Sequence, residues 1–91
     1  MERQFKISIF RPGVEEPEYR RFSMREPIRF GQFRSKIYHL FNPYLTPTIR
    51  ILWTDKDGDD VTVRRENEFF LALDFMDDTS EYIFKLYLQA R

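Results

Sequence analysis

Hydrophobic and polar residues alternate at the start of the chain in a pattern that predicts a β-hairpin. In the segment Arg3–Phe10, hydrophobic residues occupy every second position, and a period of two is typical of a half-buried strand. The segment Pro12–Pro17 interrupts this pattern, because proline cannot donate to a strand ladder and Pro-Gly favours a turn. Extended character resumes over Glu18–Met24, where we expect Tyr19 and Phe22 to be apolar anchors.

Two later segments have the spacing of amphipathic helices. After Pro27, apolar residues recur at helical intervals until Asn42-Pro43, where proline disfavours helical backbone in the residue before it. A second helical pattern covers Glu66–Met76. The positions expected to face the core are Phe30, Phe33, Ile37, Leu40 and Phe41 in the first helix, and Phe69, Ala72, Leu73 and Met76 in the second.

Three more strands are predicted, at Thr48–Trp53, Val61–Val63 and Tyr82–Gln89, with a turn at 77–80. The last strand is apolar on both faces, which favours a central position in the sheet. The predicted order is strand, strand, helix, strand, strand, helix, strand. We therefore expect an α+β fold with a mixed sheet of about five strands and two helices on one face, which is the order of ubiquitin-like β-grasp folds.

Composition limits the function classes that the chain can belong to. Its 91 residues favour one domain over 1–91, and they include no cysteine and one histidine, His39. Neither a thiolate site nor a histidine ligand set is available, so we expect no catalytic residues, no metal and no cofactor. No apolar run approaches the ~20 residues of a membrane span. The N-terminus lacks a signal-peptide core, and we expect a cytoplasmic protein that is not an enzyme.

The zero net charge hides a separation of charge along the chain. Residues 1–45 carry nine basic and five acidic side chains, whereas residues 46–91 carry six basic and ten acidic ones. The acidic residues gather between Asp55 and Asp60, where four aspartates occur within six residues. Such a cluster repels itself unless a cation compensates it.

Three interpretations of this acidic segment compete. Asp55, Asp57, Asp59 and Glu66 match the acidic ligand positions of a calcium-binding EF-hand loop, although Asp60 stands where that loop needs glycine. The preceding β-branched segment is also a poor entering helix. A second interpretation is a solvated turn without a partner. The third is an anionic surface that accepts charge-assisted hydrogen bonds from the lysines and arginines of a partner.

The third interpretation is supported by a family resemblance. An aromatic residue, Trp53, precedes the sequence Asp-x-Asp-Gly-Asp, and a short apolar strand and Glu-x-Glu follow. This arrangement resembles the acidic OPCA motif of the Phox-and-Bem (PB1) interaction domains, which are ubiquitin-like β-grasp domains that pair an acidic face with a basic one. The resemblance implies acceptor carboxylates at Asp55, Asp57, Asp59 and Glu68, with Asp60 and Glu66 as secondary acceptors. Lys56 departs from the pattern, since an acidic residue is common there.

The same resemblance implies a basic face built from Lys6, Arg20 and Arg21. Lys6 lies in the polar register of the first strand, so Lys6 and one of the two arginines can share a face of the hairpin. The sequence Arg-Arg-Phe-Ser resembles that of sequestosome-type autophagy receptors.

These two faces predict a scaffold domain, in an autophagy or signalling adaptor, that associates head to tail with itself or with other members of the family. A nucleic-acid-binding β-grasp domain is an alternative, because arginines alternate with aromatic residues over 20–36. The dense acidic segment would repel phosphates, so we expect no nucleic-acid partner and no membrane partner.

Overall fold

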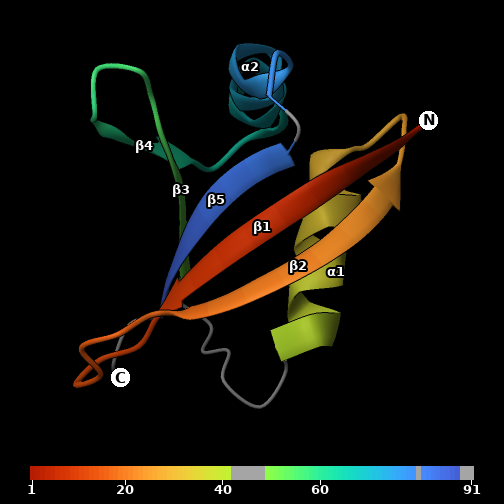
Figure 1. Cartoon of the computed structure of the whole chain (residues 1–91). Coiled ribbons are helices and arrows are strands. Elements are labelled where there is room, and N and C mark those ends of the chain that lie inside the picture. Colours follow the sequence, from red (N-terminus) through yellow and green to blue (C-terminus); the bar gives the residue numbers. More distant parts are fainter. Residues whose placement is uncertain (42–48, 80, 89–91) are drawn as a thin grey trace.

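The computed structural model describes residues 1–41, 49–79 and 81–88 (Figure 1). In these residues, five strands and two helices follow one another in the predicted order. They are β1 (Glu2–Phe10), β2 (Glu18–Arg25), α1 (Phe30–Phe41), β3 (Ile49–Thr54), β4 (Asp60–Val63), α2 (Glu66–Met76) and β5 (Glu81–Leu88). The predicted helix end at Asn42-Pro43, and the predicted strand and turn ends at Thr48, Ser80 and Gln89, lie outside the described residues.

The strands form one mixed sheet in the order β2-β1-β5-β3-β4 (Figure 1). β1 pairs in parallel with β5, and the other neighbouring strands are antiparallel. The α+β, ubiquitin-like arrangement is therefore confirmed, and so is the central position of β5. Only one face of β5 faces the core, however, since Ile83 on the other face is 46% exposed.

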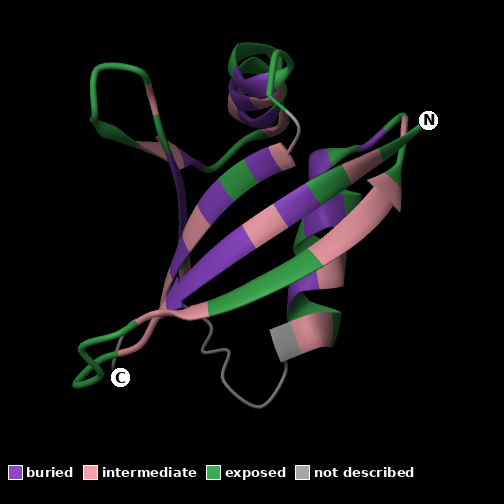
Figure 2. Ribbon diagram, viewed as in Figure 1, coloured by how far each residue is buried: buried purple, intermediate pink, exposed green. Residues whose placement is uncertain are grey.

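Both helices cover the same face of the sheet and bury an aromatic core between the layers (Figure 2). Phe33 of α1 is fully buried at the centre of this core. Its ring centroid lies 5.4 Å from that of Phe5, 5.0 Å from that of Phe69 and 4.9 Å from that of Phe84. One side chain therefore contacts β1, α2 and β5, which follows from the helical spacing of the apolar positions.

The register of β1 against β2 decides which side chains lie on the face opposite the helices, here called the outer face. Phe5 pairs with Phe22 on the core face, and their rings stack with centroids 5.2 Å apart. Tyr19 is three residues from Phe22, and an odd separation places it on the outer face, where it is 58% exposed. The prediction of Tyr19 as an apolar anchor was therefore wrong, whereas Phe22 packs against the core.

A polar network joins the start of β1 to the connection between α2 and β5. The Arg3 guanidinium donates to the Tyr82 hydroxyl at 2.8 Å, and that hydroxyl donates to the Asp77 carboxylate at 2.6 Å. Arg3 also forms ion pairs with Asp77 and Glu26. The hydrogen bond from Tyr82, and then the one from Arg3, lower the pKa of Asp77. This stabilisation is present above the ordinary carboxyl pKa and is lost as the pH falls through the lowered value.

Replacement of Phe33 by alanine is expected to destabilise the fold severely. Truncating a buried phenylalanine costs about 3–5 kcal/mol, a large part of the roughly 5–15 kcal/mol that stabilises a domain. Chemical denaturation should show a much lower midpoint. The matched control is Tyr38→Ala, which removes a surface aromatic side chain of the same helix and should change stability by about 0.5 kcal/mol or less. Equal losses in the two variants would contradict the packing described.

Candidate interaction faces

The acidic segment forms a tight loop between β3 and β4, here called the acidic loop (residues 55–60). The Asp55 carboxylate accepts hydrogen bonds from the backbone N–H groups of Asp57 and Asp59, at 3.0 and 2.9 Å. The Asp55 N–H donates to the Asp59 carbonyl, and the Gly58 N–H donates to the Asp55 carbonyl. Gly58 has a φ of +86°, which favours glycine. The Asp55 carboxylate therefore stabilises the loop by binding its backbone N–H groups.

Asp57 and Asp59 present the free carboxylates of this loop. Both residues are exposed. Neither carboxylate forms a hydrogen bond or an ion pair with another residue in the part of the chain that the structure describes. The backbone bonds to Asp55 hold both residues in place, so the two carboxylates are positioned for a cation from outside.

Asp60 begins β4 and is engaged within the domain. Its carboxylate accepts from the Thr54 hydroxyl at 2.8 Å and forms an ion pair with the Lys85 ammonium at 3.1 Å. These two contacts, that of Thr54 first, lower the pKa of Asp60. The carboxylate thus remains ionised, but a partner would have to share it with Lys85.

The two glutamates of the motif stabilise the start of α2 and its contact with α1. The Glu68 carboxylate accepts from the N–H groups of Arg64 and Arg65 at 2.9 and 3.0 Å, which satisfies donors that the helix leaves unpaired. Glu66 forms an ion pair with Arg29 at 2.7 Å. Both glutamates are half-buried. The role of Glu68 as an acceptor for a partner stays a prediction, and its capping role is one that the sequence interpretation missed.

The arrangement of these carboxylates argues against the calcium interpretation. The segment that enters the loop is strand β3 instead of a helix. Asp55 points inward to backbone donors, and Glu66 is held by Arg29 near the start of α1. Among the described residues, no group of three or more histidine, cysteine, aspartate or glutamate side chains is placed to hold a metal ion.

Lys6 and Arg21 form the basic pair on the outer face. They are direct partners in the antiparallel register of β1 and β2, so their side chains extend on the same side of the sheet. The Lys6 ammonium lies 5.0 Å from the centroid of the Tyr19 ring, a distance typical of a cation–π contact. Arg21 forms a long ion pair with Glu81, at 3.5 Å. The Tyr19 ring therefore stabilises the Lys6 ammonium. The sequence interpretation missed this role because it assigned Tyr19 to the core face of the hairpin.

Arg20 lies on the opposite side of β2 from this pair. It is the register partner of Ile7, whose side chain belongs to the core face, and its guanidinium forms an ion pair with Glu18 at 2.9 Å. The structure thus brings together Lys6 and one of the two predicted arginines, as the hairpin argument requires. Arg20 does not share their face.

The acidic loop and the basic pair lie at opposite edges of the sheet. Because the strand order is β2-β1-β5-β3-β4, the basic pair on β1 and β2 is separated from the β3–β4 loop by β5 (Figure 1). Neighbouring strands are about 4.8 Å apart, so the two charged sites cannot neutralise each other within one molecule.

Comparison with known sequences identifies the family of the chain. The sequence pattern of the PB1 domain family matches residues 15–91. The chain belongs to the PB1 domain family. PB1 domains are protein interaction modules. The matched residues include the acidic loop and Arg21, whereas β1 with Lys6 precedes them. No curated protein matches the chain.

Solved structures of PB1 domains share the fold. The solution structure of the PB1 domain of Cdc24p (long form) is 17% identical, with a TM-score of 0.68 over 97% of this chain and 96% of that chain. The AtNBR1-PB1 domain is 17% identical, with a TM-score of 0.64 over 96% and 99%. A cryo-EM structure of an AtNBR1-PB1 filament (L-type) is 22% identical, with a TM-score of 0.59 over 97% and 98%. In the described residues of this PB1 domain, no helix is long and apolar enough to cross a membrane.

Two substitutions of Glu68 are expected to separate its capping role from a role in partner binding. Glu68→Ala removes the acceptor for two backbone N–H groups and should lower the free energy of unfolding by about 1 kcal/mol. Glu68→Gln keeps an acceptor oxygen without the charge and should retain most of the stability. Thermal melts measure stability, and light scattering measures assembly. If Glu68→Gln assembles like the wild type, Glu68 is a capping residue only.

Proposed function

We propose that this PB1 domain is a non-enzymatic scaffold module that associates head to tail. The acidic loop of one copy contacts the basic pair of the next, with Asp57 and Asp59 as acceptors and Lys6 and Arg21 as donors. The observation that carries the proposal is the placement of two oppositely charged sites on the two sides of β5 in one sheet, with Asp57, Asp59 and Arg21 exposed and Lys6 half-buried. A contact between two different surfaces does not close on itself as a symmetric dimer does, and it repeats into filaments or rings.

The internal partners of these groups determine how easily the contact forms. Asp57 and Asp59 break no ion pair within the described residues when they bind a cation. Arg21 is 64% exposed and exchanges only the long contact with Glu81. Each exposed ion pair contributes about 0.2–1 kcal/mol, so several must act together. Asp55, which holds the loop, and the secondary carboxylates of Asp60 and Glu66 serve mainly to position the acceptors and to strengthen the negative potential.

The proposed partner is a second copy of this chain or another PB1 domain with a complementary face. The similarity to a PB1 domain solved as a filament supports homo-oligomers. We propose an adaptor of autophagy or signalling as the setting, with a cytoplasmic location, and the similarity to the PB1 domain of NBR1, an autophagy receptor, favours the first. Nucleic acid and membranes are not part of this proposal, and binding to a random oligonucleotide would test that choice directly.

Two variants that each lack one site should test the head-to-tail contact. Lys6→Ala removes the basic site and Asp57→Ala the acidic one, and both should fold because these positions are not in the core. Wild-type mass should increase with concentration beyond a dimer at low salt, whereas each variant alone should be smaller. An equimolar mixture should stop at a one-to-one heterodimer, because each variant keeps the site that the other lacks.

Light scattering at two concentrations and two salt concentrations measures these masses. Salt should shrink the wild-type assembly, since the Debye length falls from about 10 Å at 0.1 M to about 3 Å at 1 M. A mixture that stays monomeric, or that polymerises, would contradict the two-site arrangement. Circular dichroism of each variant is the control for folding.

Neighbouring arginines of β2 provide a matched test of the face that is used. Arg21→Ala removes a cation from the outer face beside Lys6, whereas Arg20→Ala removes one from the other side of the same strand. We expect Arg21→Ala to weaken assembly several-fold more than Arg20→Ala, as measured by analytical ultracentrifugation. Equal effects would show that the basic surface extends around the edge of β2.

A further inference from the structure

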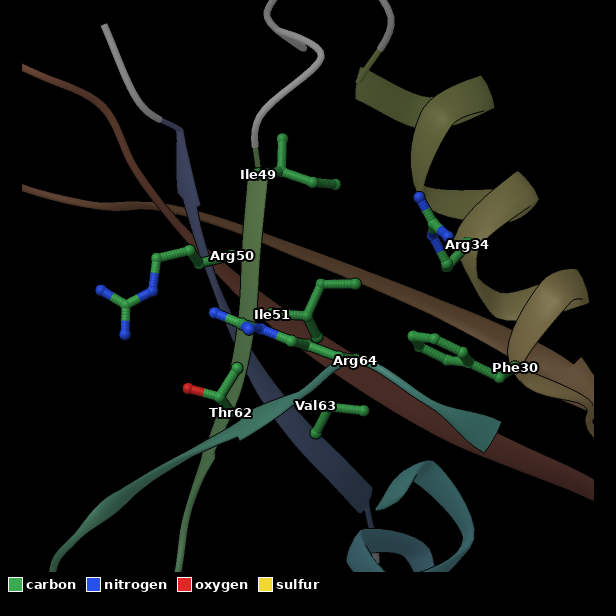
Figure 3. A pocket seen from close by; sticks show the side chains of 8 residues that line it. All are labelled: Phe30, Arg34, Ile49, Arg50, Ile51, Thr62, Val63 and Arg64. Atoms are coloured by element: carbon green, nitrogen blue, oxygen red, sulfur yellow. The ribbon is translucent and has the colours of Figure 1, made fainter. Parts of the chain in front are cut away.

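A hollow of about 410 Å³ opens at the edge of the sheet where β3 begins (Figure 3). This volume is within the usual range of about 300–1,000 Å³ for ligand pockets. β4 pairs only with the Ile51–Thr54 part of β3, so Ile49 and Arg50 have no β4 partner on this side. Residues of α1, β3 and β4 and the first residue after β4 line the hollow: Phe30, Arg34, Ile49, Arg50, Ile51, Thr62, Val63 and Arg64.

Three arginines supply all the charge of this lining. Arg34 comes from α1, Arg50 from β3 and Arg64 from the first residue after β4. Arg34 lies on the α1 side of β3, Arg50 extends from the side away from α1, and Arg64 reaches across the strand between them (Figure 3). All three residues are exposed. Within the described residues, none of the three forms an ion pair with a carboxylate, and no acidic residue lines the hollow. Three uncompensated cations around one hollow produce a positive potential that favours an anionic ligand.

Among the described residues, five of the other seven arginines pair with a carboxylate, whereas Arg25 and Arg65 do not. Carboxylates pair with Arg3, Arg11, Arg20, Arg21 and Arg29. The planar guanidinium group can bind a carboxylate through two parallel hydrogen bonds. The arginines of the hollow therefore have donors available for carboxylates that this domain does not supply.

The floor of the hollow is apolar. Phe30, Ile51 and Val63 are 7%, 4% and 3% exposed, and the Arg34 guanidinium lies 5.8 Å from the Phe30 ring centroid. An apolar floor beneath cations fits a hydrophobic side chain flanked by carboxylates better than it fits a bare phosphate, which would remain hydrated. Among the described residues, the part of β3 at Ile49 and Arg50 has no partner on the β4 side, so it can also pair with the main chain of an extended peptide, which a lipid headgroup or a phosphate does not have.

We propose that this hollow is a docking site for an acidic peptide segment of another protein, with carboxylates on both sides of one hydrophobic residue. The site differs from the basic pair, which lies on β1 and β2 beyond β5. It also differs from the acidic loop, because Arg50 and Asp55 lie at opposite ends of β3, about 16 Å apart along the strand. Peptide binding and head-to-tail assembly can therefore occur on the same molecule.

Fluorescence anisotropy with a short labelled peptide, which carries glutamates on both sides of one phenylalanine, tests this proposal on the whole chain. Replacing Arg50 and Arg64 together by glutamine should raise the Kd at least about tenfold, because two charge-assisted contacts are lost. Arg65→Gln is the matched control, since Arg65 is adjacent to Arg64 but does not line the hollow. That variant should bind within about twofold of the wild type.

Lys6→Ala separates this site from the head-to-tail contact. It should keep peptide binding and lose assembly, whereas the double variant should lose peptide binding and keep assembly, which also shows that the double variant folds. Loss of peptide binding in Lys6→Ala would overturn the proposal, because the peptide would then occupy the basic pair. The proposal would also be overturned if a peptide with glutamines in place of the glutamates bound the wild type with the same Kd. Competition by inorganic phosphate, phosphatidylserine vesicles or a random oligonucleotide at the same concentration would assign the site to phosphates instead.

Discussion

The pairing of β1 on both of its sides is the constraint on which the rest of the structure depends. β1 lies antiparallel to β2 and parallel to β5, so neither neighbour can slip without disturbing the other. Because side chains alternate between the faces, a shift of one residue would exchange the buried Phe5 and Ile7 for Lys6. The hydrophobic core thus holds the basic pair in place, because the burial of Phe5, Ile7 and Ile9 fixes Lys6 beside Arg21 on the outer face.

The carboxylates near the other edge of the sheet have two roles: some stabilise the domain, and others are exposed acceptors in the contact that we propose. Asp55 closes the acidic loop, Glu68 caps α2 and Glu66 holds Arg29. The side chains of Asp57 and Asp59 remain exposed, because the bonds that shape the loop involve only the backbone of these two residues. The acidic motif therefore contains two kinds of carboxylate. Some form bonds within the domain, and these bonds hold Asp57 and Asp59 in positions where their own carboxylates have no internal partner among the described residues.

Sequence patterning predicted the order of the elements, the mixed sheet and the central place of β5, because hydrophobic periodicity reflects burial directly. It also limited the outer face of the hairpin to Lys6 and one arginine. The choice between Arg20 and Arg21 needed the register, which depends on how the long connection between β1 and β2 is closed. Tyr19 was misassigned for the same reason. Arg34, Arg50 and Arg64 are far apart in sequence and meet only through the packing of α1 beside the β3–β4 edge, so no local signal could group them.

The acidic loop and the basic pair place unlike charges at different ends of the strand order, so these two sites contribute a dipole component along the sheet. A neutral domain has no net attraction to another copy at a distance, but two dipoles attract when they align end to end and repel when they meet with like ends. In the head-to-tail contact that we propose, this attraction would turn an approaching copy toward the productive orientation before the surfaces touch, within the distance that salt leaves unscreened. The dipoles of successive copies would add in the proposed assembly, so the free end of a row of aligned copies would attract the next copy more strongly than a single domain does.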